Sequence, residues 1–404
     1  MANQINILRR AALALSILAC VCYASAQSKF TVLYNFRGGS DGANPQMTLI
    51  TDSSGVLYGT TTNGGGQGTV FKLSPPRQGR IWAETVLHRF AGGSDGANPV
   101  AGLILGKDGA LYGTTLNGGN THCPQGCGVV FKVSKTGRET VLYRFTDTNS
   151  DAANPGGGVI FDQSGNLFGT TEQGGDQNNG AVFELTRKGG VWKESTIHSF
   201  HQFKDGYDPH DGLIMDQSGA LYGTTMKGGR SLDGVVFRMN EDSSGWNFTT
   251  LYSFDPHGAD GIHPVSGLIF DQAGSLYGTT QFGGWRNALD SGTVFKLTPG
   301  GDESLLYSFT GGHDGSIPQA GLVLDRAGAF YGTTFAGGGS GQGVIFKLTP
   351  QVDGSYIESV QHSFTGGSDG GGPVGGLLFG KDGALYGTAS VGGRSNQGVV
   401  FRLK

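Results

Sequence analysis

Four short apolar segments recur along the chain, separated by polar, glycine-rich stretches. One complete unit contains 267–274, 277–280, 292–297 and 305–309. The segments are rich in β-branched and aromatic residues and are bounded by Gly, Asp, Asn or Pro, which is typical of β-strands. In the segment 141–145, alternate residues fall on one face, as in a sheet. The pattern predicts four strands per unit, here called a, b, c and d in chain order.

The second segment reads Tyr-Gly-Thr-Thr or a near copy, and it occurs seven times at intervals of 54 to 56 residues. The copies begin at Tyr58, Tyr112, Phe168, Tyr222, Tyr277, Tyr331 and Tyr386. Four-stranded units that repeat around an axis form a β-propeller. We therefore predict an all-β fold, a seven-bladed β-propeller of four-stranded blades.

The two ends of the chain indicate how the ring closes. A lone d strand, Thr31–Phe36, precedes the first complete unit, and the chain ends with a c strand, Val399–Leu403. We expect the ring to be closed by pairing of this N-terminal strand with the C-terminal blade, which leaves no free edge. An open solenoid would need dissimilar capping repeats, and none is visible.

Phenylalanine occupies two positions in every repeat, one within strand c and one at the end of strand d. The strand c residues are Phe71, Phe131, Phe183, Phe237, Phe295, Phe346 and Phe401. The strand d residues are Phe36, Phe90, Phe145, Phe200, Phe254, Phe309 and Phe364. We predict that these rings pack between blades, because burial of so many large side chains dominates a core.

The first 26 residues have the features of an export signal. Arg9 and Arg10 precede a short apolar stretch, 11–21, and Ala24-Ser25-Ala26 is a small-residue cleavage site. The apolar stretch is shorter than the roughly 20 residues of a membrane helix, so we expect no transmembrane segment. We predict a signal peptide at 1–26, one propeller domain at 27–404, and a secreted or periplasmic protein. A lipoprotein anchored at Cys20 is the alternative.

Composition excludes several classes of protein. Aromatic residues make up 10% of the chain and charged residues only 15%, which is unlike a disordered sequence. The 75 glycines exclude long helices. The formal net charge is −4 and no basic cluster is present, so we expect no nucleic-acid partner. Cys123 and Cys127 are predicted to form a local disulfide, because a zinc site would need more ligands than the adjacent His122.

The repeat resembles the tandem-repeat family of exported bacterial proteins called GloVer. The resemblance rests on Gly-Leu-Ile-x-Asp-x-x-Gly, Tyr-Gly-Thr-Thr-x-x-Gly-Gly and Gly-x-Val-Phe-x-Leu, and it covers the whole chain after the signal. It implies export and often a C-terminal surface anchor, but no reaction. The last strand ends one residue before Lys404, so we expect no C-terminal sorting domain.

In a propeller the d–a and b–c loops open on one face, and here both are glycine-rich. Each d–a loop carries an aspartate: Asp41, Asp95, Asp151, Asp205, Asp260, Asp314 and Asp369. Such a ring could bind cations or sugar hydroxyls. Recurrence in every blade favours the simpler interpretation that each aspartate stabilises its own turn before Gly and Pro.

Residues that depart from the repeat are better candidates for function. The loop 201–211 has the densest polar cluster, and further histidines, arginines and a tryptophan follow on the same face. The candidate binding residues are Asp205, Asp208, His210, Asp211, Lys227, Arg230, His257, His263, Trp285, Arg286, His313 and Arg394. Metal or acid–base chemistry could use such groups, but solvated loop variation explains the same residues. We expect no metal and no cofactor.

We predict a monomeric exported propeller that acts as a binding or scaffold module for a glycan or a protein. Its ligand is expected on the d–a/b–c face, with Trp285 and Arg286 as anchors. The alternative is a polysaccharide-active hydrolase or lyase that uses the same face. Fold alone does not distinguish the two, because propellers host both.

Overall fold

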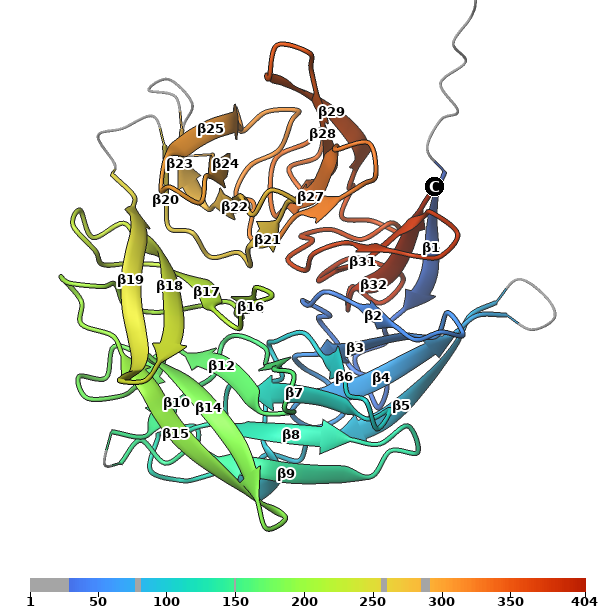
Figure 1. Cartoon of the computed structure of the whole chain (residues 1–404). Helices are drawn as coiled ribbons and strands as arrows, with labels where there is room; N and C mark the ends of the chain where they lie inside the picture. The colour runs from blue at the N-terminus through green and yellow to red at the C-terminus, as the bar shows by residue number, and fades with distance from the viewer. Residues whose placement is uncertain (1–28, 77–80, 149, 256–259, 285–290) are drawn as a thin grey trace, which may run out of the picture.

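Seven four-stranded antiparallel sheets surround a central axis (Figure 1). The structure is a computed structural model that describes residues 29–76, 81–148, 150–255, 260–284 and 291–404. The predicted all-β, seven-bladed propeller of four-stranded blades is confirmed. The predicted signal peptide at 1–26 lies outside the described residues. We number the blades one to seven in chain order, with the sheet that contains both chain ends as blade seven.

Strand bounds follow the repeat closely. Blade one contains β2 (Ile50–Thr51), β3 (Leu57–Thr61), β4 (Thr69–Ser74) and β5 (Ala83–Arg89), and blade two contains β6 (Ile104–Leu105), β7 (Leu111–Thr115), β8 (Val129–Val133) and β9 (Glu139–Arg144). Blade three contains β11 (Ile160–Phe161), β12 (Leu167–Thr171), β14 (Ala181–Lys188) and β15 (Val191–Ser199), and blade four contains β16 (Ile214–Met215), β17 (Leu221–Thr225), β18 (Val235–Asp242) and β19 (Gly245–Ser253). Blade five contains β21 (Ile269–Phe270), β22 (Leu276–Thr280), β24 (Thr293–Leu297) and β25 (Glu303–Ser308), and blade six contains β26 (Val323–Leu324), β27 (Phe330–Thr334), β28 (Val344–Pro350) and β29 (Tyr356–Ser363).

Blade seven is assembled from both ends of the chain. It contains β30 (Leu378–Phe379), β31 (Leu385–Ala389), β32 (Val399–Leu403) and β1 (Phe30–Asn35). The first and last strands pair antiparallel, with Phe30 opposite Leu403 and Asn35 opposite Val399. They lie side by side in Figure 1, where blue meets dark red. Strand c of blade seven therefore has a partner on both sides.

The glycine of strand b and the phenylalanine of strand c form a cross-strand pair in each blade. In blade four these are Gly223 and Phe237. A β-carbon on Gly223 would lie 2.6 Å from the Phe237 ring, closer than atoms can approach, so the ring can occupy this place only over glycine. The other six strand b glycines have the same close contact, at 2.5–2.8 Å.

Each strand c phenylalanine also contacts the strand d phenylalanine of the preceding blade. The ring centroids are 5.0–5.4 Å apart at all seven blade interfaces. At most 1% of either residue is exposed. The prediction that these phenylalanines pack between blades is confirmed.

The d–a and b–c loops of each blade lie against each other on one face. In blades three and five they form two-stranded ribbons, β10 (Ala152–Ala153) with β13 (Gln173–Gly174) and β20 (Gly261–Ile262) with β23 (Phe282–Gly283). The other five blades have a single bridge at the same place, such as Ala43 with Asn63. A short 3-10 turn, Gly93–Asp95, lies in one d–a loop. Both loop sets therefore share a face, as expected.

Five blade interfaces contain a partly buried glutamate of strand d, close to the aspartate of the d–a loop that enters the same blade. Burial, followed by the charge of that aspartate, raises the pKa of each glutamate to about 7. The pairs are Glu84 with Asp41, Glu139 with Asp95, Glu194 with Asp151, Glu303 with Asp260, and Glu358 with Asp314. Phenylalanine takes this place at the other two interfaces, where Phe248 stacks on His198 and Phe30 on His362.

Deletion of Thr31–Phe36 is expected to destabilise the whole ring, because it exposes one edge of β32 and removes Phe36 from the core. Loss of one fully buried phenylalanine costs about 3–5 kcal/mol by itself. Thermal unfolding and size-exclusion chromatography of the truncated protein will measure the effect. An unchanged melting temperature together with unchanged elution would show that the ring does not depend on this pairing.

The interface glutamates predict a pH dependence of stability. A folded-state pKa of about 7, above the usual 4.5, gives a stabilising contribution that is complete below about pH 4.5 and is lost as the pH rises through 7. Glu303→Gln, which cannot ionise, should therefore gain stability relative to the wild type between pH 5 and pH 8.5. Urea unfolding at both pH values measures this, with the exposed Glu241→Gln as control. A Glu303→Gln difference that stays constant with pH contradicts the assignment.

Candidate functional site

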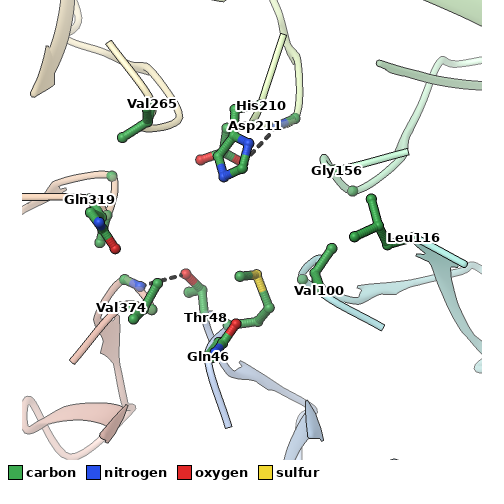
Figure 2. A pocket seen from close by; sticks show the side chains of 18 of the residues that line it. Gln46, Thr48, Val100, Leu116, Gly156, His210, Asp211, Val265, Gln319 and Val374 are labelled. Carbon is green, nitrogen blue, oxygen red and sulfur yellow. Dashed lines mark hydrogen bonds between the residues drawn. The ribbon is translucent and has the colours of Figure 1, made fainter. Parts of the chain in front are cut away.

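A cavity of about 490 Å³ lies on the propeller axis and is lined by residues from all seven blades. Its volume is in the range of pockets that take small ligands. The lining comes from the inner end of each d–a loop, immediately after a proline, and from the b–c loops. Figure 2 shows the labelled side chains of these segments arranged around one opening.

The residue that follows the proline differs among the blades although its surroundings repeat. In order from blade one to blade seven, these lining residues are Gln46, Val100, Gly156, His210, Val265, Gln319 and Val374. The leucine or valine three positions further on is buried in every blade. The side chain that faces the cavity thus varies between blades, while the buried residue three positions further on stays nearly the same.

A second variable position follows the Tyr-Gly-Thr-Thr segment. It holds a different residue in each blade: Thr62, Leu116, Glu172, Met226, Gln281, Phe335 and Ser390. Leu116, Glu172, Met226 and Gln281 line the cavity. The cavity wall is therefore asymmetric, although the seven blades around it repeat the same arrangement of strands.

Hydrogen bonds between blades hold the lining segments in place. The first threonine of each Tyr-Gly-Thr-Thr segment donates from Oγ1 to a backbone carbonyl of the next blade's inner loop, at 2.8–3.4 Å. In blade three, for example, Thr170 donates to the carbonyl of Asp211 at 2.8 Å. These bonds explain why threonine recurs beside the variable position.

The ionisable side chains in the described part of the cavity wall lie in one corner, between blades three and four. Among the described residues that line the cavity, the ionisable side chains are Glu172, His210 and Asp211. Nδ1 of His210 lies 3.0 Å from Oε1 of Glu172, and this contact raises the pKa of the imidazole. Burial raises the pKa of Asp211, although the amide of Gly212 donates to its carboxylate at 2.6 Å.

Asp208 extends this corner toward the loop surface. One ligand atom each from Glu172, Asp208 and His210 lies within 4.8 Å of the other two. Oδ2 of Asp208 is 3.4 Å from Nζ of Lys227. The corner therefore brings a basic imidazole next to carboxylates, a combination suited to proton transfer or to metal binding.

The structure separates the predicted polar loop 201–211 into two groups. His210 and Asp211 face the cavity and Asp208 lies beside them. Asp205 is only 3% exposed and accepts the amide proton of His201 at 2.6 Å. It also lies 3.1 Å from Nε2 of His198. Asp205 thus belongs to the loop frame rather than to the cavity wall.

None of the remaining candidates that the structure describes lines the cavity. His263 is 4.0 Å from Asp233, and Lys227 contacts Asp208. Arg230, Arg394 and His313 are exposed. Trp285, Arg286 and His257, which include the two predicted anchors, lie outside the described residues.

The d–a aspartates stabilise their own loops. Each accepts the amide proton of a residue four or five positions earlier, as Asp314 does from Thr310 at 2.8 Å. Each also contacts a strand d ring, which is tyrosine in four blades and His88, His198 or His362 in the others. These contacts support the interpretation of the seven aspartates as turn residues.

Cys123 and Cys127 form a disulfide in the b–c loop of blade two, as predicted. Both residues are nearly buried, and the amide of Asn154, from the next d–a loop, donates to the carbonyl of Cys127 at 2.8 Å. The bridge therefore fixes a long loop at the blade two–three boundary.

Most neutral residues of the cavity wall were missed by the sequence analysis, which searched for charged and aromatic side chains. The missed residues include Gln46, Val100, Leu116, Met226, Val265, Gln281, Gln319 and Val374. A signal was present: alignment of the seven repeats shows two variable positions next to nearly constant ones, one after the proline and one after Thr-Thr.

The fold and cavity define a seven-bladed propeller with an asymmetric axial pocket. The Gloeobacter/Verrucomicrobia repeat family matches residues 20–160, 121–325 and 286–404, and the chain belongs to this family. Among proteins with curated descriptions, no sequence matches the chain.

Two solved structures show a similar fold. The extracellular domain of BT4673 from B. thetaiotaomicron aligns with a TM-score of 0.55 and 10% identity, over 92% of this chain and 39% of that one. PorZ, a surface component of the type-IX secretion system of Porphyromonas gingivalis, aligns with a TM-score of 0.52 and 15% identity, over 91% and 47%. This chain spans less than half the length of either protein, and the likeness extends to the fold alone.

Within the described residues, no helix has the length and apolar character needed to cross a membrane.

The role of the d–a aspartates predicts that Asp314→Ala lowers the free energy of unfolding by about 2–3 kcal/mol, because Tyr307 and Thr310 lose a shared acceptor. Urea unfolding measures the loss, with the exposed Asp176→Ala as control. A calcium-dependent rise in melting temperature that Asp314→Ala abolishes would instead support a cation ring.

Proposed function

We propose that this protein is an exported binding or scaffold module whose ligand, a glycan or a protein, inserts a small group into the axial cavity from the d–a/b–c face. The observation that carries the proposal is the pair of cavity-facing positions that vary between blades while the residues directly before them stay nearly constant. Repetition alone would give a sevenfold symmetric wall, and a symmetric wall offers few distinctive contacts to an asymmetric ligand.

The chemical character of the cavity wall indicates which class of ligand fits it. Gln46, Gln281 and Gln319 provide amide donors and acceptors, and valine, leucine and methionine provide aliphatic contact. No Phe, Tyr or Trp is among the described residues of the wall, so this part of the wall offers a sugar ring no such face to pack on. This composition favours an aliphatic or amide-bearing side chain of a protein partner over a sugar unit.

Export is supported by the form of the first 26 residues and by the disulfide between Cys123 and Cys127. Two proteins of similar fold, the extracellular domain of BT4673 and the surface component PorZ, are themselves outside the cytoplasm according to their descriptions. We extend this location to the present chain as part of the proposal.

A polysaccharide-active hydrolase or lyase is the second candidate. It is favoured by the 3.0 Å contact between His210 and Glu172 beside Asp211, since paired acid and base groups in a cavity are the minimum for such chemistry. Release of reducing sugar or of unsaturated product, abolished by His210→Ala, would support the enzyme. Binding without turnover supports the module.

Filling the cavity tests the proposal. Val100→Trp places a large ring in the wall, and the expected result is at least a tenfold loss of affinity, about 1.4 kcal/mol, for any partner selected from a glycan array or a displayed peptide library. Gln319→Ala should weaken the same partner by removing an amide contact. Titration calorimetry or surface plasmon resonance gives the dissociation constants.

The matched control is Val352→Trp, the same substitution at a fully exposed site in the hairpin between β28 and β29. It should bind like the wild type, and the melting temperatures of all variants should agree within a few degrees. If Val100→Trp keeps full affinity while substitutions in the a–b turns abolish binding, the partner uses the opposite face and the proposal is wrong.

A further inference from the structure

We propose that Glu172, Asp208 and His210 form a binding site for one divalent transition-metal ion at the rim of the axial cavity. Glu172 follows strand b of blade three, and the other two residues lie in the d–a loop that enters blade four. One potential ligand atom from each lies within 4.8 Å of the other two. Metal binding here does not depend on which ligand the cavity takes.

Three other blades have asparagine at the position of Asp208. The residue before the proline has a left-handed backbone, and where it is asparagine its Nδ2 donates to the carbonyl of the variable b–c residue of the preceding blade. The pairs are Asn44 with Ser390 (2.9 Å), Asn98 with Thr62 (3.2 Å) and Asn154 with Leu116 (2.9 Å). In these three blades an N–H donor thus links neighbouring blades at this point.

Asp208 keeps the backbone of these asparagines but not their chemistry. Its φ is 61°, against 53–57° for the three asparagines, and the corresponding b–c residue of the preceding blade is Glu172. A carboxylate has no N–H to donate. Asp208 therefore places a hydrogen-bond acceptor where the asparagines of blades one to three place a donor. A second carboxylate, that of Glu172, lies within the same cluster. Opposed acceptors are unfavourable without a proton or a cation between them.

Positively charged groups of the chain compensate the carboxylates of Glu172 and Asp208 only in part. Lys227 approaches Oδ2 of Asp208 at 3.4 Å and lies over the Tyr207 ring, but its side chain is 37% exposed, so this ion pair contributes little stability. His210 contacts Glu172 through Nδ1 and, as a neutral imidazole, becomes a metal ligand itself. A divalent ion would interact with both carboxylates and the imidazole at once.

The donor set selects the type of metal. Two carboxylates and one imidazole suit Zn²⁺ or Mn²⁺, whereas Ca²⁺ takes six to eight oxygen ligands. Zn²⁺ binds such atoms at about 2.1 Å, which places them about 3.4 Å apart. Separations as large as 4.8 Å would therefore have to shorten by about 1.4 Å. Three protein ligands leave a coordination position open for water or for an oxygen of a molecule in the cavity.

The test uses the whole chain without a histidine tag, after treatment with a chelator. Titration calorimetry with ZnCl₂ and with MnCl₂ should show one site per chain, and Co²⁺ should give visible absorption bands that His210→Ala removes. Asp208→Asn restores the asparagine used in blades one to three. This variant should therefore fold with an unchanged or higher melting temperature while its Zn²⁺ affinity falls at least tenfold.

Two variants serve as controls. Asp176→Asn changes an exposed acid in the same loop as Glu172, and His313→Ala removes an exposed histidine on the same face. Both should bind Zn²⁺ like the wild type. The inference is overturned if the wild type binds neither Zn²⁺ nor Mn²⁺ at millimolar concentration, if Ca²⁺ binds more tightly than both, or if a folded Asp208→Asn keeps full affinity.

Discussion

The close contact between the glycine of strand b and the phenylalanine of strand c is the constraint on which the ring depends. The phenylalanine ring lies where a β-carbon would be, which brings it deep enough to meet the strand d phenylalanine of the preceding blade. The same strand b carries the threonine that donates to the next blade's inner loop. One short segment, Tyr-Gly-Thr-Thr, therefore fixes packing within a blade and hydrogen bonding between blades.

Two of the positions that vary between blades lie beside the cavity. The residue after the proline lines the cavity in every blade, and the residue after Thr-Thr does so in four blades. Both directly follow nearly constant residues, so substitutions there change the cavity wall. A repeat protein can in this way acquire an asymmetric site while its frame stays symmetric. The charged corner at Glu172 and His210 is one outcome of such variation.

The carboxylates of the chain differ mainly in which neighbouring groups compensate their negative charge. Aspartates of the a–b turns accept from strand b tyrosines, as Asp216 does from Tyr222 at 3.0 Å. Blade three has phenylalanine at that place, and there Asn166 donates to Asp162 instead. The d–a aspartates accept backbone amides, and the interface glutamates respond to burial by a raised pKa. Asp208 follows none of these patterns, since it replaces an amide donor with a carboxylate.

The amino-acid sequence alone determined the number of blades, the four strands of each, the packing role of the phenylalanines and the disulfide. These features follow from local patterns repeated seven times, and repetition makes each pattern unambiguous. The tertiary structure alone decided which loop residues meet. Glu172 and His210 come from different blades, and the neutral residues around the axis become a wall only when the ring brings seven distant segments together. Periodicity reports what is common to the repeats, whereas a binding site on the axis consists of what differs between them.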